Sequence, residues 1–231
     1  MLPAMTDIVP PPGQTHRFEL YGFWRSSSSY RVRFALGHKG LAVRTIPVNL
    51  LKGEHVSAEH RSRHPMGRVP CLLVDGRPFV ESVAIIELLD ELYPTPPLYP
   101  SDPLARADVR AMVETINSST QPLQNTEVLT RLSKDPGVQK AWAAHFIARG
   151  LGAFEALLER AEVRGIEGPF AYGPTLTAAD IFLVPQVYNA RRYGVDLGPF
   201  ERVMRAEHAA AATPAGLRAA PERQPDAPPS A

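Results

Sequence analysis

A proline-rich segment, YPTPPLYPSDP at residues 93–103, separates two parts of the chain that differ in character. Its five prolines lack backbone N–H donors, so the segment favours turns over a continuous helix or strand. Strand-like and helix-like stretches alternate before it, whereas the periodic stretches after it are helix-like. The sequence therefore predicts an α/β domain over residues 16–93, a linker over residues 94–102 and an all-helical domain over residues 103–231.

The predicted α/β domain has the order β-α-β-(α)-β-β-α. Alternating and aromatic-rich stretches predict strands at residues 16–23 and 42–50. A hairpin is predicted further along, with arms at residues 71–74 and 78–80 joined by a turn at Asp75-Gly76. The polar stretch between the second strand and the hairpin is irregular and allows one short helix.

Two helices are predicted in the same domain. The first is expected over residues 29–39, with Gly40 as its C-cap, and the second opens at Ser82. On the helix that opens at Ser82, apolar residues recur at the spacing of one buried face. These residues are Ile85, Leu88, Leu89 and Leu92.

The predicted second domain shows helical periodicity throughout. One buried face is predicted from Val109, Met112, Val113 and Ile116, and another from Ile147, Leu151, Phe154 and Leu158 on a long helix over residues 136–162. A further helix begins at Thr177, where Thr177 and Asp180 have the spacing of a capping box. We expect this pair to be structural.

The charge and cysteine content exclude several classes of protein. With 25 basic and 24 acidic residues, the net charge of +1 leaves no electrostatic footprint for nucleic acid or for an anionic membrane. The single cysteine, Cys71, forbids an intramolecular disulfide and is typical of a reducing cytoplasm. No apolar run approaches the roughly 18 residues that span a bilayer, and the N-terminus lacks a signal-peptide pattern. We therefore expect a cytoplasmic protein with neither a nucleic-acid nor a membrane partner.

Both ends of the chain are rich in proline. Residues 1–15 predict a flexible extension, and the final stretch, APERQPDAPPSA, predicts a tail that is loose or lies over the surface. The hydrophobic fraction of 44% is enough for a sizeable core between these ends.

Four consecutive serines, Ser26 to Ser29, stand between the first predicted strand and the first predicted helix. Hydroxyl and N–H groups at a helix start favour an anion, and a thiolate carried by a cofactor would suit them. The alternative is helix capping alone, which we would favour if the run stood by itself. The sequence has no Gly-x-Ser-x-Gly elbow, and no histidine or acid adjoins the serines.

Two dipeptides in the first domain suggest a peptide-like ligand. A cis Val69–Pro70 bond would turn the Val69 backbone outward, where it could pair with an extended peptide. From spacing alone, an ordinary trans proline opening a strand is the more frequent case. Glu81 and Ser82, at a helix start, could hold the ammonium and carboxylate of an amino-acid end, or be a solvated acid and a capping serine.

The histidines do not predict a metal site. His55, His60 and His64 lie five and four residues apart, without thiolates or a second cluster to complete a ligand set. We expect no bound metal.

The order of these features resembles that of the cytosolic glutathione transferases, in which a thioredoxin-like domain precedes a helical one. The resemblance runs from about residue 16 to the C-terminus. Among the glutathione transferases, the chain resembles the zeta class most specifically. That class contains maleylacetoacetate isomerase and close relatives acting on maleylpyruvate. Its segments resemble, in order, YGFWRSSSSYRVRFAL, HPMGRVP, ESVAIIELLDELYPTPPLYP, QPLQN, LTAADIFLVPQVYNARRYGVDLGPF and RQPDAP.

The resemblance implies a glutathione site in the first domain. Ser26 matches the serine that faces the glutathione sulfur, and Ser27 beside it could share that role. Val69 would pair with the cysteinyl backbone of glutathione, with Pro70 in the cis form. The remaining glutathione contacts implied are Glu81 and Ser82 at the γ-glutamyl end and His55 at the glycyl end.

The resemblance also implies a substrate site. Gln121 and Arg192 match positions near the substrate, and Gln121 is counted among the glutathione-binding residues as well. Arg192 could pair with a substrate carboxylate through two hydrogen bonds, and Arg25 is a second candidate for that charge. The helical domain would then be the substrate-binding one, and the family implies a homodimer.

Three residues depart from the pattern of the zeta class. Ser28 stands where the class has a cysteine, which an isomerisation does not need but thiol-dependent side reactions would. Glu81 replaces a frequent glutamine, and both side chains accept a hydrogen bond from an ammonium. His64 stands where asparagine is usual, and we assign no meaning to that change.

The function implied by the resemblance is the glutathione-dependent isomerisation of maleylacetoacetate to fumarylacetoacetate in aromatic amino-acid breakdown. Maleylpyruvate isomerisation in gentisate breakdown is one alternative, and a general transferase acting on haloacids is another. A glutathione-binding module without turnover is a third, which the presence of Ser26 disfavours.

Overall fold

The computed structural model describes residues 10–228 of the chain and divides it into two compact units. One unit comprises the chain up to Pro96 together with the segment that begins at Pro214, and the other comprises Pro97–Thr213. The unit boundary at Pro96 lies inside the predicted linker. The segment from Pro214 groups with the first unit, whereas the sequence predicted that it would belong to the helical domain.

The first unit is built on a four-stranded mixed sheet in the order β2-β1-β3-β4. Its strands are β1 (Phe18–Gly22), β2 (Arg44–Pro47), β3 (Cys71–Val74) and β4 (Arg77–Val80). β1 runs parallel to β2 and antiparallel to β3, and the predicted hairpin joins β3 to β4. The α/β class predicted for this part of the chain is confirmed.

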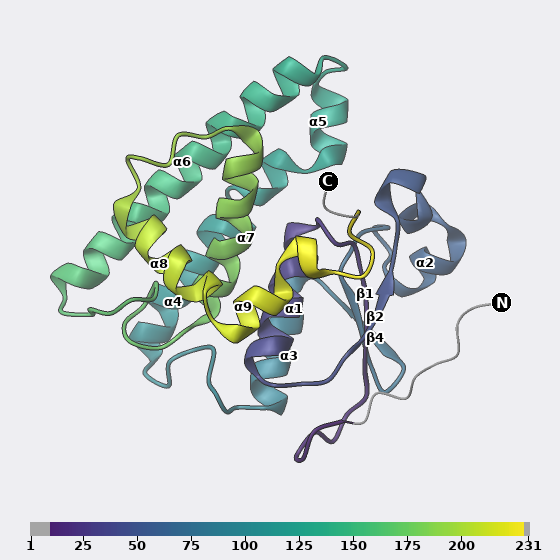
Figure 1. Ribbon diagram of the computed structural model, residues 1–231, viewed down its shortest axis with the longest axis horizontal. Helices are drawn as coiled ribbons and strands as arrows, with labels where there is room; N and C mark the ends of the chain where they lie inside the picture. Colours follow the sequence, from purple (N-terminus) through teal and green to yellow (C-terminus); the bar gives the residue numbers. More distant parts are fainter. Residues whose placement is uncertain (1–9, 229–231) are drawn as a thin grey trace. The chain divides into compact units, whose positions relative to one another are not determined.

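Three α-helices surround the sheet (Figure 1): α1 (Ser27–His38), α2 (Ala58–Arg63) and α3 (Ser82–Leu92). Figure 1 shows α1 and α3 on one side of the sheet and α2 on the other. Two short 3-10 helices, η1 (Leu50–Lys52) and η2 (Glu54–Val56), precede α2. The short helix allowed by the polar stretch is therefore present as α2.

Two details of the predicted helices are wrong. α1 begins at Ser27, two residues before the predicted start, because the side chain of Ser26 already caps the helix. On α3 the buried stripe starts at Ser82 and continues through Ile85, Ile86 and Leu89, so that Leu92 lies beyond it and is exposed. The predicted stripe began one turn too late.

A buried lysine closes the end of the first unit. The side chain of Lys39 is fully buried, and its ammonium donates to the Asp90 carboxylate at 2.8 Å and to the carbonyls of Tyr93 and Pro96 at 2.6 and 2.9 Å. Because three acceptors surround its three protons, the buried charge is fully compensated. Lys39 thereby joins the end of α1 to the end of α3.

The predicted N-terminal extension is only partly covered by the structure, since residues 1–9 lie outside the described range. Of the remainder, Gln14 is held by side-chain hydrogen bonds to the backbone of His16 and Ala42, and the Thr15 N–H donates to the Tyr93 hydroxyl. These two residues are part of the first unit, so the prediction of a flexible extension is wrong for them.

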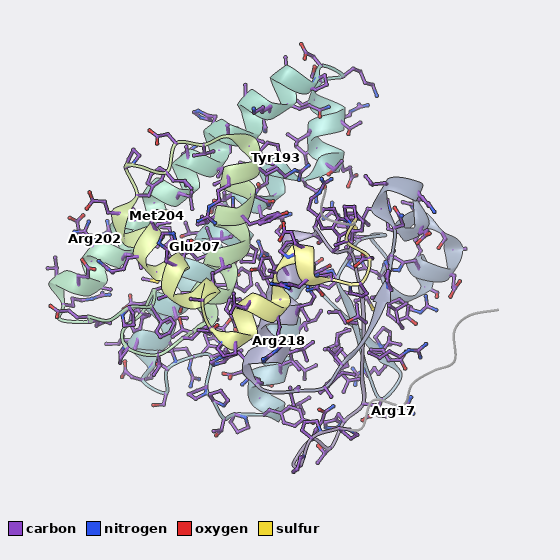
Figure 2. All side chains as sticks on the ribbon, in the orientation of Figure 1. Arg17, Tyr193, Arg202, Met204, Glu207 and Arg218 are labelled. Carbon is purple, nitrogen blue, oxygen red and sulfur yellow. The ribbon has the colours of Figure 1, made fainter. Side chains whose placement is uncertain are left out.

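The C-terminal segment, defined here as residues 214–228, contains α9 (Pro214–Ala219) and η4 (Pro221–Arg223). Figure 1 shows it in yellow, with α9 beside α1. Gly37 on α1 faces Ala215 closely enough that a Cβ at Gly37 would lie 3.6 Å from the Ala215 Cβ. Arg218, labelled in Figure 2, donates to the Gly37 carbonyl at 3.5 Å. The small residues allow the two helices to approach closely.

The second unit is all-helical, as predicted. Its helices are α4 (Pro103–Asn117), η3 (Gln121–Gln124), α5 (Thr126–Leu132), α6 (Pro136–Val163), α7 (Ala178–Tyr193) and α8 (Glu201–Ala211). The eight apolar residues predicted to form its buried faces are all buried. None of the helices in the described range combines the length and apolarity that a bilayer crossing requires.

The predicted capping box at the start of α7 is present. The carboxylate of Asp180 accepts hydrogen bonds from the N–H of Thr177 at 2.9 Å and from the N–H of Ala171 at 2.7 Å. Asp180 is fully buried, and this burial raises its pKa to about 6 although the hydrogen bonds act in the opposite direction. The pair is structural, since it ties the preceding loop to α7.

Candidate active site

Ser26 caps the N-terminus of α1. Its backbone is extended, and its hydroxyl oxygen accepts a hydrogen bond from the Ser29 N–H at 3.2 Å. The Ser26 N–H in turn donates to the Phe23 carbonyl at 3.0 Å. Because the hydroxyl uses a lone pair for capping, its own proton stays available for an anionic ligand.

The other three serines have different roles. Ser27 and Ser28 are partly exposed and belong to the first turn, whose N–H groups have no intrahelical acceptor. Ser29 is fully buried, and its hydroxyl accepts from the Phe23 N–H at 3.4 Å. Ser29 therefore holds the loop, whereas Ser26 and Ser27 stand where a ligand can reach them.

The Val69–Pro70 peptide bond is cis, as the resemblance implied. Val69 is buried in an apolar cluster with Phe23 and Val48, and Trp24 packs against this cluster. Because Phe23 and Trp24 precede the serines, the cluster brings the loop before β3 next to the loop that ends in Ser26. The structure thus assembles Ser26, Val69 and Pro70 in one region of the first unit.

Glu81 and Ser82 stand at the start of α3. Glu81 is exposed and has a φ of 67°, a left-handed conformation that is unfavourable for a glutamate. Ser82 is buried, and its hydroxyl accepts a hydrogen bond from the fully buried Arg31 at 3.1 Å. No side chain caps α3, so the alternative of Ser82 as a capping serine is wrong. Arg31 fixes the Ser82 oxygen and leaves its proton to donate to a carboxylate.

His55 lies in η2, and its backbone carbonyl comes close to Gly67, where a Cβ would stand 3.0 Å from it. The imidazole Nδ1 is buried without a hydrogen-bond partner in the described part of the chain. Burial lowers the pKa of His55, and the neighbouring His60 and Arg61 lower it further. A neutral imidazole with an unused nitrogen fits a hydrogen bond to a peptide or carboxylate group.

Arg25 directly precedes Ser26, and its guanidinium lies 5.2 Å from the centre of the Trp24 ring. This stacking keeps a positive charge beside the start of α1. Arg25 is therefore placed to attract an anion toward the serines.

Gln121 and Arg192 belong to the second unit. Gln121 is the first residue of η3, and Arg192 lies on the last turn of α7, which Tyr193 marks in Figure 2. Arg191 forms two parallel hydrogen bonds with the buried Glu207 carboxylate, at 2.7 and 2.8 Å. Arg192 is exposed, stacks over the Tyr193 ring at 5.1 Å and makes no ion pair within residues 10–228. Of the two neighbouring arginines, Arg192 therefore has the charge to offer a ligand.

Sequence reasoning missed three residues that support the site, namely Arg31, Arg33 and Asp226. Arg31 and Arg33 are buried on α1, and the sequence showed them only as two cations inside the apolar run YRVRFAL of a zeta-like segment. Charges in such a run indicate buried hydrogen-bonding partners. Asp226 lies in the zeta-like segment RQPDAP, but that match did not indicate its partner, which lies far away along the chain.

Comparison with known families identifies both halves of this arrangement. The family model for the glutathione S-transferase N-terminal domain matches residues 20–97, and that for the glutathione S-transferase C-terminal domain matches residues 144–219. Maleylacetoacetate isomerase of Pseudomonas aeruginosa is 42% identical over 216 residues, which cover 91% of this chain and 99% of that protein.

Two solved structures are similar over almost the whole chain. A maleylpyruvate isomerase, described as a bacterial zeta-class glutathione S-transferase, has a TM-score of 0.87 and 39% identity over 91% of this chain and 100% of its own. Maleylacetoacetate isomerase of Anaeromyxobacter dehalogenans, with glutathione bound in its active site, has a TM-score of 0.83 and 48% identity over 93% of this chain and 100% of its own. The chain therefore belongs to the glutathione S-transferases, and within them to the zeta class.

Proposed function

We propose that this protein is a glutathione-dependent cis–trans isomerase that converts maleylacetoacetate to fumarylacetoacetate. The observation that carries the proposal is the Ser26 hydroxyl, which accepts a hydrogen bond from α1 and retains its proton for a ligand. The similarity to isomerases of this class over more than nine-tenths of the chain supports the choice of reaction.

The chemistry divides between glutathione and the protein. When bound, glutathione supplies a thiolate that adds reversibly to the cis double bond, which becomes single and can rotate. A free thiol has a pKa of about 8.5 and is mostly protonated at neutral pH. Ser26, Ser27 and the free N–H groups of α1 stabilise the thiolate by hydrogen bonding and by the helix dipole.

The remaining contacts in the first unit orient glutathione. Ser82, fixed by Arg31, donates to the γ-glutamyl carboxylate, and the exposed Glu81 accepts from its ammonium. The Val69 backbone beside the cis Pro70 pairs with the cysteinyl part, and His55 binds the glycyl end. Together these contacts fix the position of the sulfur relative to Ser26.

Two arginines balance the charge of the dicarboxylic substrate. Arg192 pairs with a substrate carboxylate, and Arg25 stabilises the negative charge that develops beside the reacting bond. The family resemblance assigns Gln121 to glutathione and substrate binding, for which its amide can donate or accept a hydrogen bond.

Maleylpyruvate is a second candidate substrate, favoured by the similarity to the zeta-class maleylpyruvate isomerase. Both substrates contain a cis double bond next to a carbonyl and carry two carboxylates. The same residues can therefore bind either substrate. The QPLQN segment, which contains Gln121, is the reason for preferring maleylacetoacetate. A transferase that conjugates haloacids is a further alternative. Ser28 in place of cysteine argues only against side reactions that need a thiol of the protein.

The assembly and the cellular setting are part of the proposal. We expect a homodimer, as in the family, acting in the cytoplasm on the tyrosine breakdown pathway. A single buried cysteine supports a reducing environment, because Cys71 needs no partner there.

The test is to mix the purified protein with maleylacetoacetate and, separately, with maleylpyruvate, each with and without glutathione. We expect glutathione-dependent formation of the trans product, with the higher kcat/KM for maleylacetoacetate. A higher value for maleylpyruvate would overturn the choice of substrate. No glutathione-dependent change with either compound would overturn the isomerase.

A further inference from the structure

The C-terminal segment returns to the loop that carries the serines. The carboxylate of Asp226 accepts a hydrogen bond from the Trp24 N–H at 2.9 Å, although the two residues lie 202 positions apart in the sequence. Trp24 is two residues before Ser26. One acidic side chain near the end of the chain therefore holds the backbone beside the proposed thiol site.

Arg33 binds two carbonyls of the same stretch of backbone. Its guanidinium donates to the Trp24 carbonyl at 2.9 Å and to the Phe23 carbonyl at 3.4 Å. Its Nε donates to the carbonyl of Ala219, the last residue of α9, at 3.3 Å. Because the guanidinium is a rigid planar fork, these three bonds fix the loop relative to the C-terminal segment.

The charges of Asp226 and Arg33 also complement one another. Arg33 is only 8% exposed, and burial lowers its pKa to about 10. The negative charge of Asp226 opposes this shift, and so does the nearby Tyr30. Asp226 thus offsets part of the cost of burying a guanidinium under the loop.

The geometry points to Asp226 as a positioning residue for the thiol site. It fixes the Trp24 N–H, and Arg33 fixes the Phe23 carbonyl of the same peptide group and the Trp24 carbonyl of the next one. Both peptide groups that lead into Arg25 and Ser26 are therefore held. The Phe23 carbonyl, a partner of Arg33, also accepts from the Ser26 N–H at 3.0 Å. A displaced peptide would therefore shift the Ser26 hydroxyl. This inference rests on the proposed function for the role of Ser26.

Loss of the Asp226 contact is expected to act locally. The bonds of Arg33 to the loop and to α9 do not involve Asp226, and α9 remains packed on α1. Without its acceptor the Trp24 N–H turns to water, and the loop gains freedom while the fold persists. A displacement of about 1 Å at a reacting group can reduce a rate by up to a hundredfold.

The experiment compares Asp226→Ala and Asp226→Asn with Arg223→Ala, an exposed residue of the same segment whose side chain forms no hydrogen bond within residues 10–228. Asp226→Asn keeps an oxygen that can accept from the Trp24 N–H. Three quantities are measured for each variant in the full-length protein. The first is amide hydrogen exchange over residues 23–29. The second is the pH at which the thiol of bound glutathione ionises, read from the ultraviolet absorbance of the thiolate. The third is the kcat and KM of isomerisation.

We expect Asp226→Ala to exchange faster over residues 23–29, to raise the ionisation pH of the thiol and to lower kcat by about tenfold, the factor for one lost charge-assisted hydrogen bond. Asp226→Asn is expected to restore most of each effect, and Arg223→Ala to match the wild type. Unchanged thiol ionisation and kcat in a folded Asp226→Ala protein would overturn the inference, as would equal losses in Asp226→Ala and Arg223→Ala. If Asp226→Ala does not fold, Asp226→Asn carries the test. A residual increase of exchange over residues 23–29 together with a raised ionisation pH of the thiol supports the inference, and values equal to those of Arg223→Ala contradict it.

The result also separates this inference from the proposed function. If wild-type protein binds glutathione but isomerises neither diacid, the proposed function fails, and hydrogen exchange and thiol ionisation still test Asp226. If wild-type isomerisation is present and independent of Asp226, only the positioning role fails.

Discussion

Ser26 and Ser28 occupy different places at the start of α1, and this difference is testable. The Ser26 hydroxyl is held by the Ser29 N–H, whereas Ser28 makes no side-chain hydrogen bond within residues 10–228. We expect Ser26→Ala to lower kcat by about a hundredfold, as the loss of one anion-stabilising donor does in other enzymes. Ser28→Ala is expected to lower kcat less than about threefold.

A capping variant separates the two functions of Ser26. Ser26→Asp keeps an oxygen that caps α1 but places a negative charge where the thiolate would lie. We expect Ser26→Asp to unfold like the wild type in urea. We also expect it to raise the pKa of the thiol of bound glutathione and to be inactive. Equal activity of Ser26→Asp and the wild type, or equal losses in Ser26→Ala and Ser28→Ala, would mean that the wrong serine has been assigned.

Asp180 predicts a specific dependence of stability on pH. Its pKa is about 6 in the folded protein and near 3.8 in an unfolded chain, so the folded state holds the proton more tightly between these values. Its contribution to the free energy of unfolding is therefore greatest below about pH 4 and falls by roughly 3 kcal/mol as the pH rises through 6.

Urea unfolding of the wild type and Asp180→Asn measures this effect. We expect the asparagine variant to be less stable, because its amide NH₂ faces the N–H donors of Thr177 and Ala171. The stability difference between the two proteins should shrink by about 2 kcal/mol between pH 4.5 and pH 7.5. A difference that stays constant with pH would contradict the raised pKa.

The partners of site residues were hard to predict because they lie far away in the sequence. The candidate residues Ser26, Val69 and Glu81 followed from local order and from the family resemblance. The contact of Ser82 with Arg31 and that of Trp24 with Asp226 depend on how distant segments pack. No local pattern carries that information, so the sequence alone suggested that Ser82 could be a cap and that the tail could be loose or lie over the surface.

At the scale of elements, the close approach of α6 to Thr120 can be tested. A Cβ at Gly150 would lie 2.0 Å from the Thr120 hydroxyl, which is buried and donates to the Thr115 carbonyl at 2.7 Å. Thr120 directly precedes Gln121, so this contact also helps to position the start of η3. We expect Gly150→Ala to destabilise the protein by about 2 kcal/mol through overpacking.

Gly152, two positions further along the same helix, is the matched control. A Cβ there would meet only the Phe200 ring, at 3.8 Å, which is an ordinary contact. Gly152→Ala should be neutral or stabilise the helix by up to about 1 kcal/mol. Thermal unfolding of both variants, and of Gly150→Ala combined with Thr120→Ala, measures the coupling. Additive effects in the double variant would contradict the proposed contact.

Helical periodicity predicted the second unit well because the buried faces of α4 and α6 repeat over several turns. Ends of elements were less predictable. The start of α1 depends on which of four serines accepts the first hydrogen bond, and composition cannot distinguish them. The buried face of α3 begins at Ser82, because Ser82 contacts the buried Arg31 on α1. Where this face begins also determines its last buried residue, and the apolar spacing alone did not show it.

At the scale of the whole chain, the proline-rich segment predicted a division that the structure places after Pro96. The return of the C-terminal segment to the first unit was not predictable, because proline-rich ends usually indicate loose tails. Its packing rests on small residues, on Arg33 and on one carboxylate, none of which forms a periodic pattern. The proposed thiol site is consequently built from both ends of the sequence.

The proposed activity also predicts what happens to glutathione. In an isomerisation glutathione is regenerated at each turnover, whereas a conjugating transferase consumes one molecule for each molecule of substrate. The distinction separates the isomerase from the transferase alternative without reference to any single residue.

The most direct test follows maleylacetoacetate with glutathione present at one-hundredth of the substrate concentration, while both compounds and the trans product are quantified. We expect complete conversion to fumarylacetoacetate with the glutathione recovered unchanged, and loss of nearly all of this conversion in Ser26→Ala. Conversion that stops once the glutathione is exhausted, or that proceeds equally without glutathione, would contradict the proposed isomerisation.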